Sequence, residues 1–285
     1  MKKIIRKFLL TIFGYDFMWS ANFFRHMKVW PNIKKPQFFN EKVRYRIKYD
    51  QNYLYSKLAD KILVREYIKN KIGEEYLVPV RYIFDDVKDI INKNINFDNT
   101  VVKANHGAGM VLFPDAINDK TEIIKTCEQW MQTDFSKVFF EPHYAKIKPS
   151  IIVEESLCQD GNVPNDYKFH TFKSMDGNFN IVLQVVNGRF KNESRGYYLN
   201  GVNREDLVWS HGAGHHDIPD IHKSSLIDAI ELSKKLCEDF NYVRVDWYVV
   251  GKKIYFGELT FTPGAASAFE FGVVLEKKMC EFWEL

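Results

Sequence analysis

Two carboxylates near the C-terminal end of the chain, Asp246 and Glu258, lie in two runs of alternating apolar and polar residues around a glycine. Such runs predict a β-hairpin in which every second side chain points to the same face. A three-residue turn at residues 251–253, or an equivalent bulge, would place Asp246 directly opposite Glu258. Mg²⁺ is usually held by one or two carboxylates together with substrate phosphates, so the pair predicts a magnesium site. An exposed hairpin with ordinary surface charges is the alternative.

A second group of residues, around Lys103, has the chemistry to bind phosphate. Lys103 ends an apolar run that begins at Thr100, and a loop containing Gly107 and Gly109 follows it. A lysine at a strand end can reach a phosphate, while a glycine loop brings backbone N–H groups to the same anion. The loop lacks the Gly-Lys-Ser/Thr ending of a P-loop, so a plain hairpin turn is the competing interpretation.

Two more groups of charged residues stand in predicted strands. Glu154 and Glu155 follow an apolar run, where they could bind ribose hydroxyls or form a solvated strand end. Asp166, Lys168 and His170 alternate with apolar residues, so they share one face of a strand. Such a row is costly on an inner face unless it is paired or meets a ligand, and it is unremarkable on an outer face.

The elements that must position these residues are helices first and a mixed sheet later, which makes the chain α+β. A helix is predicted to open at residues 38–42, and further helices are predicted around residues 60–68, 120–132 and 224–240, with Asn40 and Asp60 as N-caps. Strands dominate from residue 150 to Thr262. We expect three regions: helical residues 1–80, residues 81–150 with the glycine loop, and residues 151–285 with the hairpin.

Composition narrows the function classes. The chain has 285 residues, a net charge of +3 and four widely spaced cysteines, with no C-x-x-C pair. The charge gives no case for nucleic acid as a partner. The cysteine spacing argues against a disulfide framework and a zinc ribbon, so we expect reduced thiols in the cytoplasm. We also expect no spanning helix and no export signal.

The segment from Met1 to Phe13 is amphipathic, with lysines and an arginine along one side. It could lie on an anionic membrane surface as a peripheral contact. Docking of its apolar stripe on the domain behind it is the favoured interpretation, because such stripes are normal in soluble folds.

Taken in order, these passages resemble the ATP-grasp superfamily, most closely its TupA-like branch, which is named for teichuronopeptide synthesis. The resemblance covers nearly the whole chain, and five ordered motifs are far more specific than one. The five motifs are Val102-Lys103-Ala104-Asn105-His106-Gly107, Ile152-Val153-Glu154-Glu155, Asp166-Tyr167-Lys168-Phe169, Val243-Arg244-Val245-Asp246 and Phe256-Gly257-Glu258-Leu259-Thr260-Phe261-Thr262-Pro263. Two earlier passages, Phe39-Asn40-Glu41-Lys42 and Asp60-Lys61, fit the same branch.

The resemblance implies a fold that clamps ATP between two α+β subdomains, here residues 81–150 and 151–285. The superfamily commonly has Asn where this chain has Thr260, so a second metal ion would be held more weakly. Since the chain ends at Leu285, we expect little room for a C-terminal lid. The implied nucleotide-binding residues are Lys103, His106, Gly107, Gly109, Glu154, Glu155 and Asp166. The implied metal ligands are Asp246, Glu258 and Thr260, and the implied catalytic residues are Lys168, Arg189 and Arg244.

The reaction that the resemblance implies is ATP-dependent joining of a carboxylate to an amine through an acyl-phosphate. Arg189, Arg195 and Arg244 would grip the acyl-phosphate oxygens, the first two from a predicted loop. The substrates would be an amino acid and a uronic acid of a capsular or cell-envelope polysaccharide precursor. A phosphotransferase, a glycosyltransferase and a non-catalytic nucleotide-binding scaffold are the alternatives. The oligomeric state stays open, a homodimer included.

A histidine cluster at His211, His215 and His216 invites a zinc interpretation. Its spacing matches no regular metal-ligand pattern, and two glycines would leave it flexible, so structural zinc is disfavoured. We expect instead a mobile loop over the active site, in which His215 or His216 accepts the proton of the amine.

Overall fold

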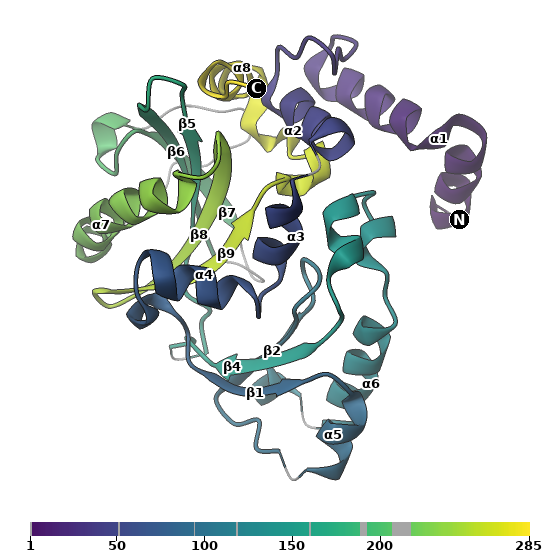
Figure 1. The fold of residues 1–285 in the computed structure, drawn as a ribbon, viewed down its shortest axis with the longest axis vertical. Coiled ribbons are helices and arrows are strands. Elements are labelled where there is room, and N and C mark those ends of the chain that lie inside the picture. The colour runs from purple at the N-terminus through teal and green to yellow at the C-terminus, as the bar shows by residue number, and fades with distance from the viewer. Residues whose placement is uncertain are drawn as a thin grey trace.

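The computed structural model describes residues 2–50, 52–93, 95–117, 119–159, 161–188, 193–206 and 218–285. Two β-sheets form the frame, a four-stranded small sheet in the order β1-β4-β2-β3 and a five-stranded large sheet in the order β7-β6-β5-β8-β9 (Figure 1). The small sheet consists of β1 (Val80–Phe84), β2 (Thr100–Ala104), β3 (Val111–Leu112) and β4 (Ile151–Glu155). The large sheet consists of β5 (Asp166–Lys173), β6 (Phe179–Asn187), β7 (Ser194–Leu199), β8 (Tyr242–Val250) and β9 (Lys253–Thr260).

The pairing within both sheets is antiparallel throughout the described strands, so the expected mixed sheet is wrong. The α+β class is confirmed, because the helices pack on two sheets whose described strands pair antiparallel and not as parallel β-α-β units. The α-helices are α1 (Lys2–Met27), α2 (Phe39–Tyr49), α3 (Tyr53–Ala59), α4 (Val64–Lys71), α5 (Val87–Asn92), α6 (Lys120–Met131), α7 (Asp220–Cys237) and α8 (Gly272–Phe282).

Three apolar cores hold these elements together. The first joins α3, α4 and α7 to one face of the large sheet. The second joins α1, α2 and α8 to part of the opposite face. The third packs α5 and α6 on the small sheet, as Figure 1 shows. In strand β5, successive side chains point to opposite faces of the sheet. Tyr167 and Phe169 are therefore buried in the first core, while Lys168 points to the other side.

The chain regions differ from the predicted boundaries. Strand β4 pairs with β1 and β2, so the small sheet extends to Glu155, past the expected boundary at residue 150. Residues 1–80 share cores with the large sheet, for example Phe39 with Phe172, and so pack on it as part of the same body. The boundary between the two sheets falls after β4, which ends at Glu155, and before β5, which begins at Asp166.

The hairpin of β8 and β9 pairs Asp246 with Glu258 and Arg244 with Thr260, as predicted. Val250 pairs with Lys253, so the turn contains only two residues, and the register shifts next to Asp246. The predicted facing pair therefore arises from a β-bulge and not from a three-residue turn.

The prediction that Asn40 is an N-cap is wrong. Helix α2 begins at Phe39, and the buried Asn40 side chain donates to the Ala268 carbonyl at 3.1 Å and accepts from the Ala268 amide at 3.3 Å. Glu41 does the capping instead, accepting from the Phe38 amide at 3.0 Å. Asp60 caps the turn before α4 by accepting from the Ile62 amide at 2.8 Å.

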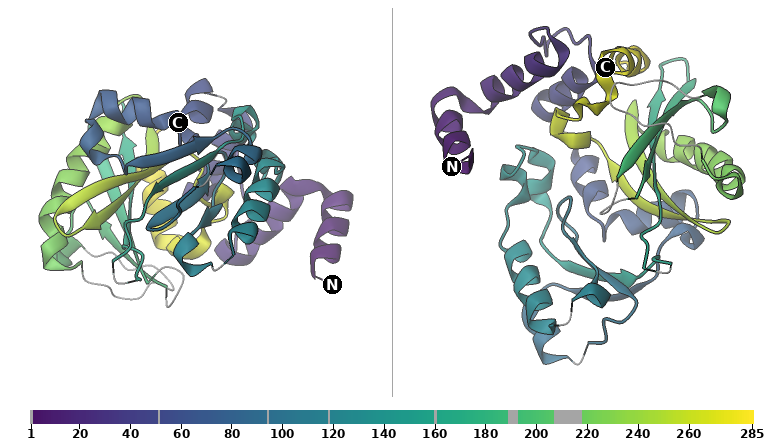
Figure 2. Two further views of the ribbon diagram at one scale, coloured as in Figure 1. Left: turned by 90° about the horizontal axis from the view of Figure 1, so that it is seen from below. Right: turned by 180° about the vertical axis from the view of Figure 1, so that it is seen from behind.

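Helix α1 bends at Gly14, where φ is 72° and ψ is 166°. Beyond the bend Trp19, Phe23 and Met27 are buried in the second core, whereas Phe13 is 50% exposed. The start of the helix stands away from the body (Figure 2). The docking surface of α1 thus lies after Gly14, outside the segment for which docking was expected. Nowhere in the described chain is a helix both long and apolar enough to cross a membrane.

Candidate active site

A cavity of about 350 Å³ lies between the two sheets. The small sheet contributes Val101, Lys103, Val111 and Glu155, and the large sheet contributes residues from each of its five strands or their ends. Its charged and polar wall is made of Lys61, Lys103, Glu155, Asp166, Lys168, His170, Gln184, Glu193, Arg195, Arg244, Asp246, Tyr248, Glu258 and Glu270. The cavity therefore brings together groups that are up to 209 residues apart, from Lys61 to Glu270.

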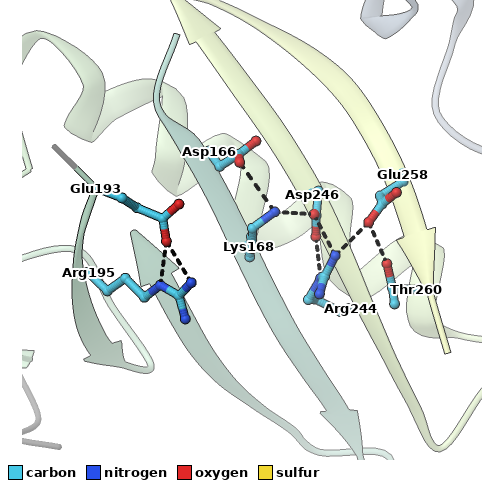
Figure 3. A network of polar contacts seen from close by, with 8 residues as sticks. All are labelled: Asp166, Lys168, Glu193, Arg195, Arg244, Asp246, Glu258 and Thr260. Atoms are coloured by element: carbon cyan, nitrogen blue, oxygen red, sulfur yellow. Dashed lines mark hydrogen bonds and ion pairs between the residues drawn. The ribbon is translucent and has the colours of Figure 1, made fainter. Parts of the chain in front are cut away.

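A line of alternating charges crosses the large sheet on its cavity face (Figure 3). Lys168 Nζ donates to Asp246 Oδ2 at 2.6 Å and lies 3.5 Å from Asp166 Oδ2. Arg244 donates to both oxygens of Asp246, at 2.6 and 2.8 Å, and to Glu258 Oε1 at 2.6 Å. The row of Asp166, Lys168 and His170 that the alternation predicts thus faces the cavity, where charged side chains are tolerated because they are paired with one another.

Charge pairing sets the protonation states of this line. Burial works to raise the pKa of Asp246, but the positive charges of Arg244 and Lys168 outweigh it and hold that pKa below its usual range. Burial and the negative charge of Asp246 both raise the pKa of Glu258, but the positive charge of Arg244 outweighs them and holds that pKa below its ordinary value. Burial lowers the pKa of Arg244, but the negative charges of Asp246 and Glu258 outweigh it and raise that pKa above its usual value. All three groups are therefore ionised at neutral pH.

The hairpin fits a magnesium ion. Asp246 and Glu258 face each other, and the Arg244 guanidinium that contacts both shows that the space between them accommodates a cation. Thr260 Oγ1 donates to Glu258 Oε1 at 2.8 Å and so orients that carboxylate. Among the described residues no group of three or more His, Cys, Asp or Glu side chains could hold a metal ion. Two carboxylates with substrate phosphates are the ligand set that Mg²⁺ commonly takes.

Lys103 enters the cavity from the small sheet with its charge partly paired. Lys103 Nζ donates to Glu154 Oε2 at 2.6 Å, and Arg65 donates to the other oxygen, Oε1, at 3.1 Å. Glu154 is buried, so in this arrangement it orients Lys103. Glu155, which is exposed, lines the cavity next to the chain that connects the sheets. The two adjacent acids thus hold different positions.

Three residues of the glycine loop, Ala108, Gly109 and Met110, line the cavity. Gly109 has a φ of 73°, which favours glycine. His106 lies behind the loop and is buried, with Nδ1 3.1 Å from Asn105 Oδ1 and Nε2 3.0 Å from the Trp130 carbonyl. Its expected contact with nucleotide does not fit this position, and we assign it a role in holding the loop.

Lys61 was not expected to contribute to the site. Lys61 Nζ donates to the Gly107 carbonyl at 2.6 Å, and the Lys61 side chain lines the cavity beside Glu258. Burial lowers the pKa of Lys61, and the negative charge of Glu258 opposes that change. The signal in the sequence was the Asp60-Lys61 passage, in which Asp60 shapes the turn and Lys61 then reaches the glycine loop.

An apolar wall completes the cavity and was also missed, because no motif marks it. It gathers side chains from β2, β3, the connection between the sheets, and β6. Its members are Val78, Val101, Met110, Val111, Phe113, Leu157, Cys158, Val163, Pro164 and Val186. Apolar walls with a few placed polar groups are typical of sites for small organic ligands and cofactors.

Four residues of the predicted site lie outside the described residues: Arg189, His211, His215 and His216. Arg195 lies in strand β7, not in a loop. All four cysteines are free thiols, as expected from their spacing.

Comparison with solved structures finds ligases. The chain is 16% identical to D-alanine-D-alanine ligase from Helicobacter pylori, with a TM-score of 0.46, covering 78% of this chain and 60% of that one. It is 15% identical to the Bacillus anthracis D-alanine–D-alanine ligase complexed with ATP, with a TM-score of 0.42, covering 80% and 67%. It is 12% identical to L-amino acid ligase from Bacillus licheniformis, with a TM-score of 0.42, covering 78% and 48%.

Comparison with curated proteins gives no match. The family model described as TupA-like ATPgrasp matches residues 41–280, which include both sheets and every described charged residue of the cavity. The resemblance drawn from the ordered motifs is therefore confirmed. The chain belongs to the TupA-like ATP-grasp family.

Proposed function

We propose that this protein is an ATP- and Mg²⁺-dependent carboxylate–amine ligase. The observation that carries the proposal is the line of Lys168, Arg244, Asp246 and Glu258 on one wall of a cavity whose other wall bears Lys103 and the glycine loop. Cations on both walls suit a substrate with several phosphates, and the carboxylate pair suits the metal ion that accompanies it.

ATP would lie across the cavity. The apolar wall suits the adenine ring, and Glu155 suits the ribose beside it. Lys103 and the backbone around Gly109 would meet the phosphates, whose outermost group would face Lys168 and Arg244. Mg²⁺, held by Asp246 and Glu258, would neutralise phosphate charge.

The reaction follows from charge. A carboxylate is a poor electrophile because its leaving group would be oxide, so one oxygen is first phosphorylated by ATP, which leaves as ADP. The neutral amine then attacks the acyl carbon, the C–N bond forms, the C–O bond to phosphate breaks, and the proton that the amine loses passes to water. Lys168 and Arg244 stabilise the negative charge that develops on oxygen during both steps.

The substrates we propose are an amino acid as the amine and a uronic acid of a capsular or cell-envelope polysaccharide precursor as the carboxylate. The resemblance to the TupA-like branch, which is named for teichuronopeptide synthesis, supports this choice. A phosphotransferase acting on a sugar hydroxyl is the competing proposal, since the same phosphate site would serve it.

One experiment separates the two. ADP release is measured with panels of uronic-acid acceptors and amino acids, and hydroxylamine then replaces the amine. A ligase releases ADP only with the carboxylate, and hydroxylamine traps the activated carboxylate as a hydroxamate. Transfer of labelled γ-phosphate to a stable sugar phosphate, without hydroxamate, would overturn the ligase proposal.

We further propose that the enzyme works in the cytoplasm at the inner membrane surface. Helix α1 and the segment after it expose an aromatic patch, defined here as Phe13, Phe17, Phe24 and Trp30. The rings contact one another, with centroids 5.0 Å apart for Phe13 and Phe17 and 6.1 Å for Trp30 with both Phe17 and Phe24. Aromatic side chains favour the membrane–water interface, and the basic residues of α1 suit anionic lipid.

A further inference from the structure

The cavity has a second charged group at the end formed by β7, apart from the line that serves ATP and metal. Arg195 donates to Glu193 Oε1 through Nε at 2.9 Å and Nη2 at 2.6 Å (Figure 3). Its Nη1 donates to Glu270 Oε1 at 2.6 Å. The three side chains are 35–38% exposed, and all three line the cavity. We call them the acceptor triad.

The triad lies within reach of the reacting groups. Arg195 of β7 pairs with Val186 of β6, and Val186 pairs with Asp166 of β5, so Arg195 and Asp166 are in register two strands apart. Neighbouring strands are ~4.8 Å apart, which puts the two backbones about 10 Å from each other. Lys168 follows Asp166 on the same face. Because Arg195 and Lys168 are long side chains on the same face of the sheet, an amine held on the triad can meet an acyl group held by Lys168.

Glu270, one of the two acids of the triad, is also held firmly. Glu270 lies in a short helical turn, Phe269–Phe271, whose Phe269 ring stacks on His26 with centroids 4.6 Å apart. The preceding loop is fixed by Trp19, which donates to the Ala266 carbonyl at 2.8 Å, and by the two hydrogen bonds of Asn40 with Ala268. Binding sites built on braced elements hold their geometry, which is what ligand recognition requires.

The charge order of the triad, negative-positive-negative, matches a zwitterion. A guanidinium binds a carboxylate through two parallel N–H···O bonds, and a carboxylate accepts from an ammonium. When an amino acid enters, its carboxylate takes the place of one acid at Arg195, and its ammonium takes the place of Arg195 at that acid. The exchange leaves every charge paired, whereas a simple amine would satisfy only the acids.

We propose that Glu193, Arg195 and Glu270 form the acceptor subsite, which binds the amine substrate as a zwitterionic amino acid, with its carboxylate on Arg195 and its ammonium on the acids. The assignment rests on the proposed ligase function and deepens it. It also moves Arg195 away from the acyl-phosphate, which leaves Arg244 as the described arginine at that position.

Two measurements test the subsite. In the first, amino acids and their α-amides are titrated calorimetrically into the wild-type protein with ATP and Mg²⁺, which requires no turnover. We expect an amino acid to bind at least tenfold more tightly than its amide, and Arg195→Gln to remove that preference while Arg25→Gln, on exposed α1, keeps it. Equal binding of acid and amide by the wild type would overturn the subsite.

In the second, amide formation and hydroxamate formation are compared in Arg195→Gln and Glu270→Gln. Hydroxylamine needs no zwitterion site, so the KM for the amino acid should rise at least tenfold more than that for hydroxylamine. A rise in the KM for the carboxylate instead would assign Arg195 to the other substrate. If the wild type forms no hydroxamate, the ligase function fails, while the calorimetric result still decides the subsite. If Arg195→Gln does not fold, Glu270→Gln and the wild-type comparison decide it.

Discussion

Arg244 allows two carboxylates to face each other in the described hairpin. Asp246 and Glu258 would repel each other across β8 and β9, and the guanidinium between them replaces repulsion with two attractive contacts. Removing one partner of a buried ion pair typically costs about 3–5 kcal/mol, so the three residues act as a unit.

Neutral replacements of the carboxylates test this unit. Asp246→Asn and Glu258→Gln keep shape and delete charge, so both should lose nearly all turnover, with at most partial recovery at high Mg²⁺. Asp246→Asn should also lower the melting temperature more, because it leaves Lys168 and Arg244 without their shared partner. ADP release across a Mg²⁺ titration and thermal denaturation measure the two effects.

The control for the carboxylate variants is Glu231→Gln, which removes an exposed surface charge from a pair with Lys234. It should leave both turnover and melting temperature within error. Wild-type turnover in either carboxylate variant would show that the facing pair does not hold the metal ion.

At the scale of the element, the bulge in the hairpin decides what Asp246 faces. Asp246 pairs with Glu258 and Trp247 with Phe256, so Gly257 is the extra residue. A Cβ at Gly257 would lie 3.0 Å from the Asp246 carbonyl oxygen and 3.2 Å from the Tyr248 ring. Both distances are shorter than ordinary van der Waals contact, so a side chain at this position would push against the Asp246 backbone and the Tyr248 ring.

Gly257→Ala should displace Glu258 and lower turnover by tenfold or more, through a higher Mg²⁺ requirement, while the protein stays folded. Gly251→Asn is the matched control, because Gly251 has a φ of 62° in the turn, open space around its Cβ position, and a conformation that Asn tolerates. The Mg²⁺ dependence of ADP release is the measurement. Equal behaviour of the two variants would count against the bulge as the device that sets the metal site.

At the scale of the whole molecule, α1 links the cavity to the surface. Its second half braces the loop at residues 263–271 through Trp19 and Phe23, and its first half projects from the body (Figure 2). Contiguous exposed apolar patches often mark interaction sites. The exposed aromatic patch is therefore the part of α1 to test for membrane contact.

The aromatic patch can be tested by sedimentation with vesicles. The wild type should pellet with vesicles rich in anionic lipid and less so as salt rises, because the contact combines apolar burial with charge attraction. Replacement of Phe13, Phe17 and Trp30 by Ser should abolish pelleting. The control replaces Tyr53, Met175 and Val274, which are also exposed but lie elsewhere. Equal loss in both triple variants, or none in either, would refute the membrane contact.

Much of the site was determined by the sequence itself. Alternation at period two identified the faces of β5, β8 and β9, because a strand offers only two faces and apolar residues mark the buried one. It therefore predicted that Asp166 and Lys168 share a face, while the pairing of Asp246 with Glu258 depended on an odd-length turn or a bulge, of which the structure has the bulge. The ordered motifs identified the family, since their residue types and order are local properties of the chain.

Only the tertiary structure decided which distant side chains meet. Asn40 clamps Ala268 across 228 residues, Glu270 joins Arg195 across 75, and Glu154 turns to Lys103 while Glu155 faces the cavity. Local patterns did not reveal that His106 points behind its loop toward Trp130. Period and propensity specify a residue's conformation and face, but its partners depend on how separate elements pack, which is a property of the folded chain as a whole.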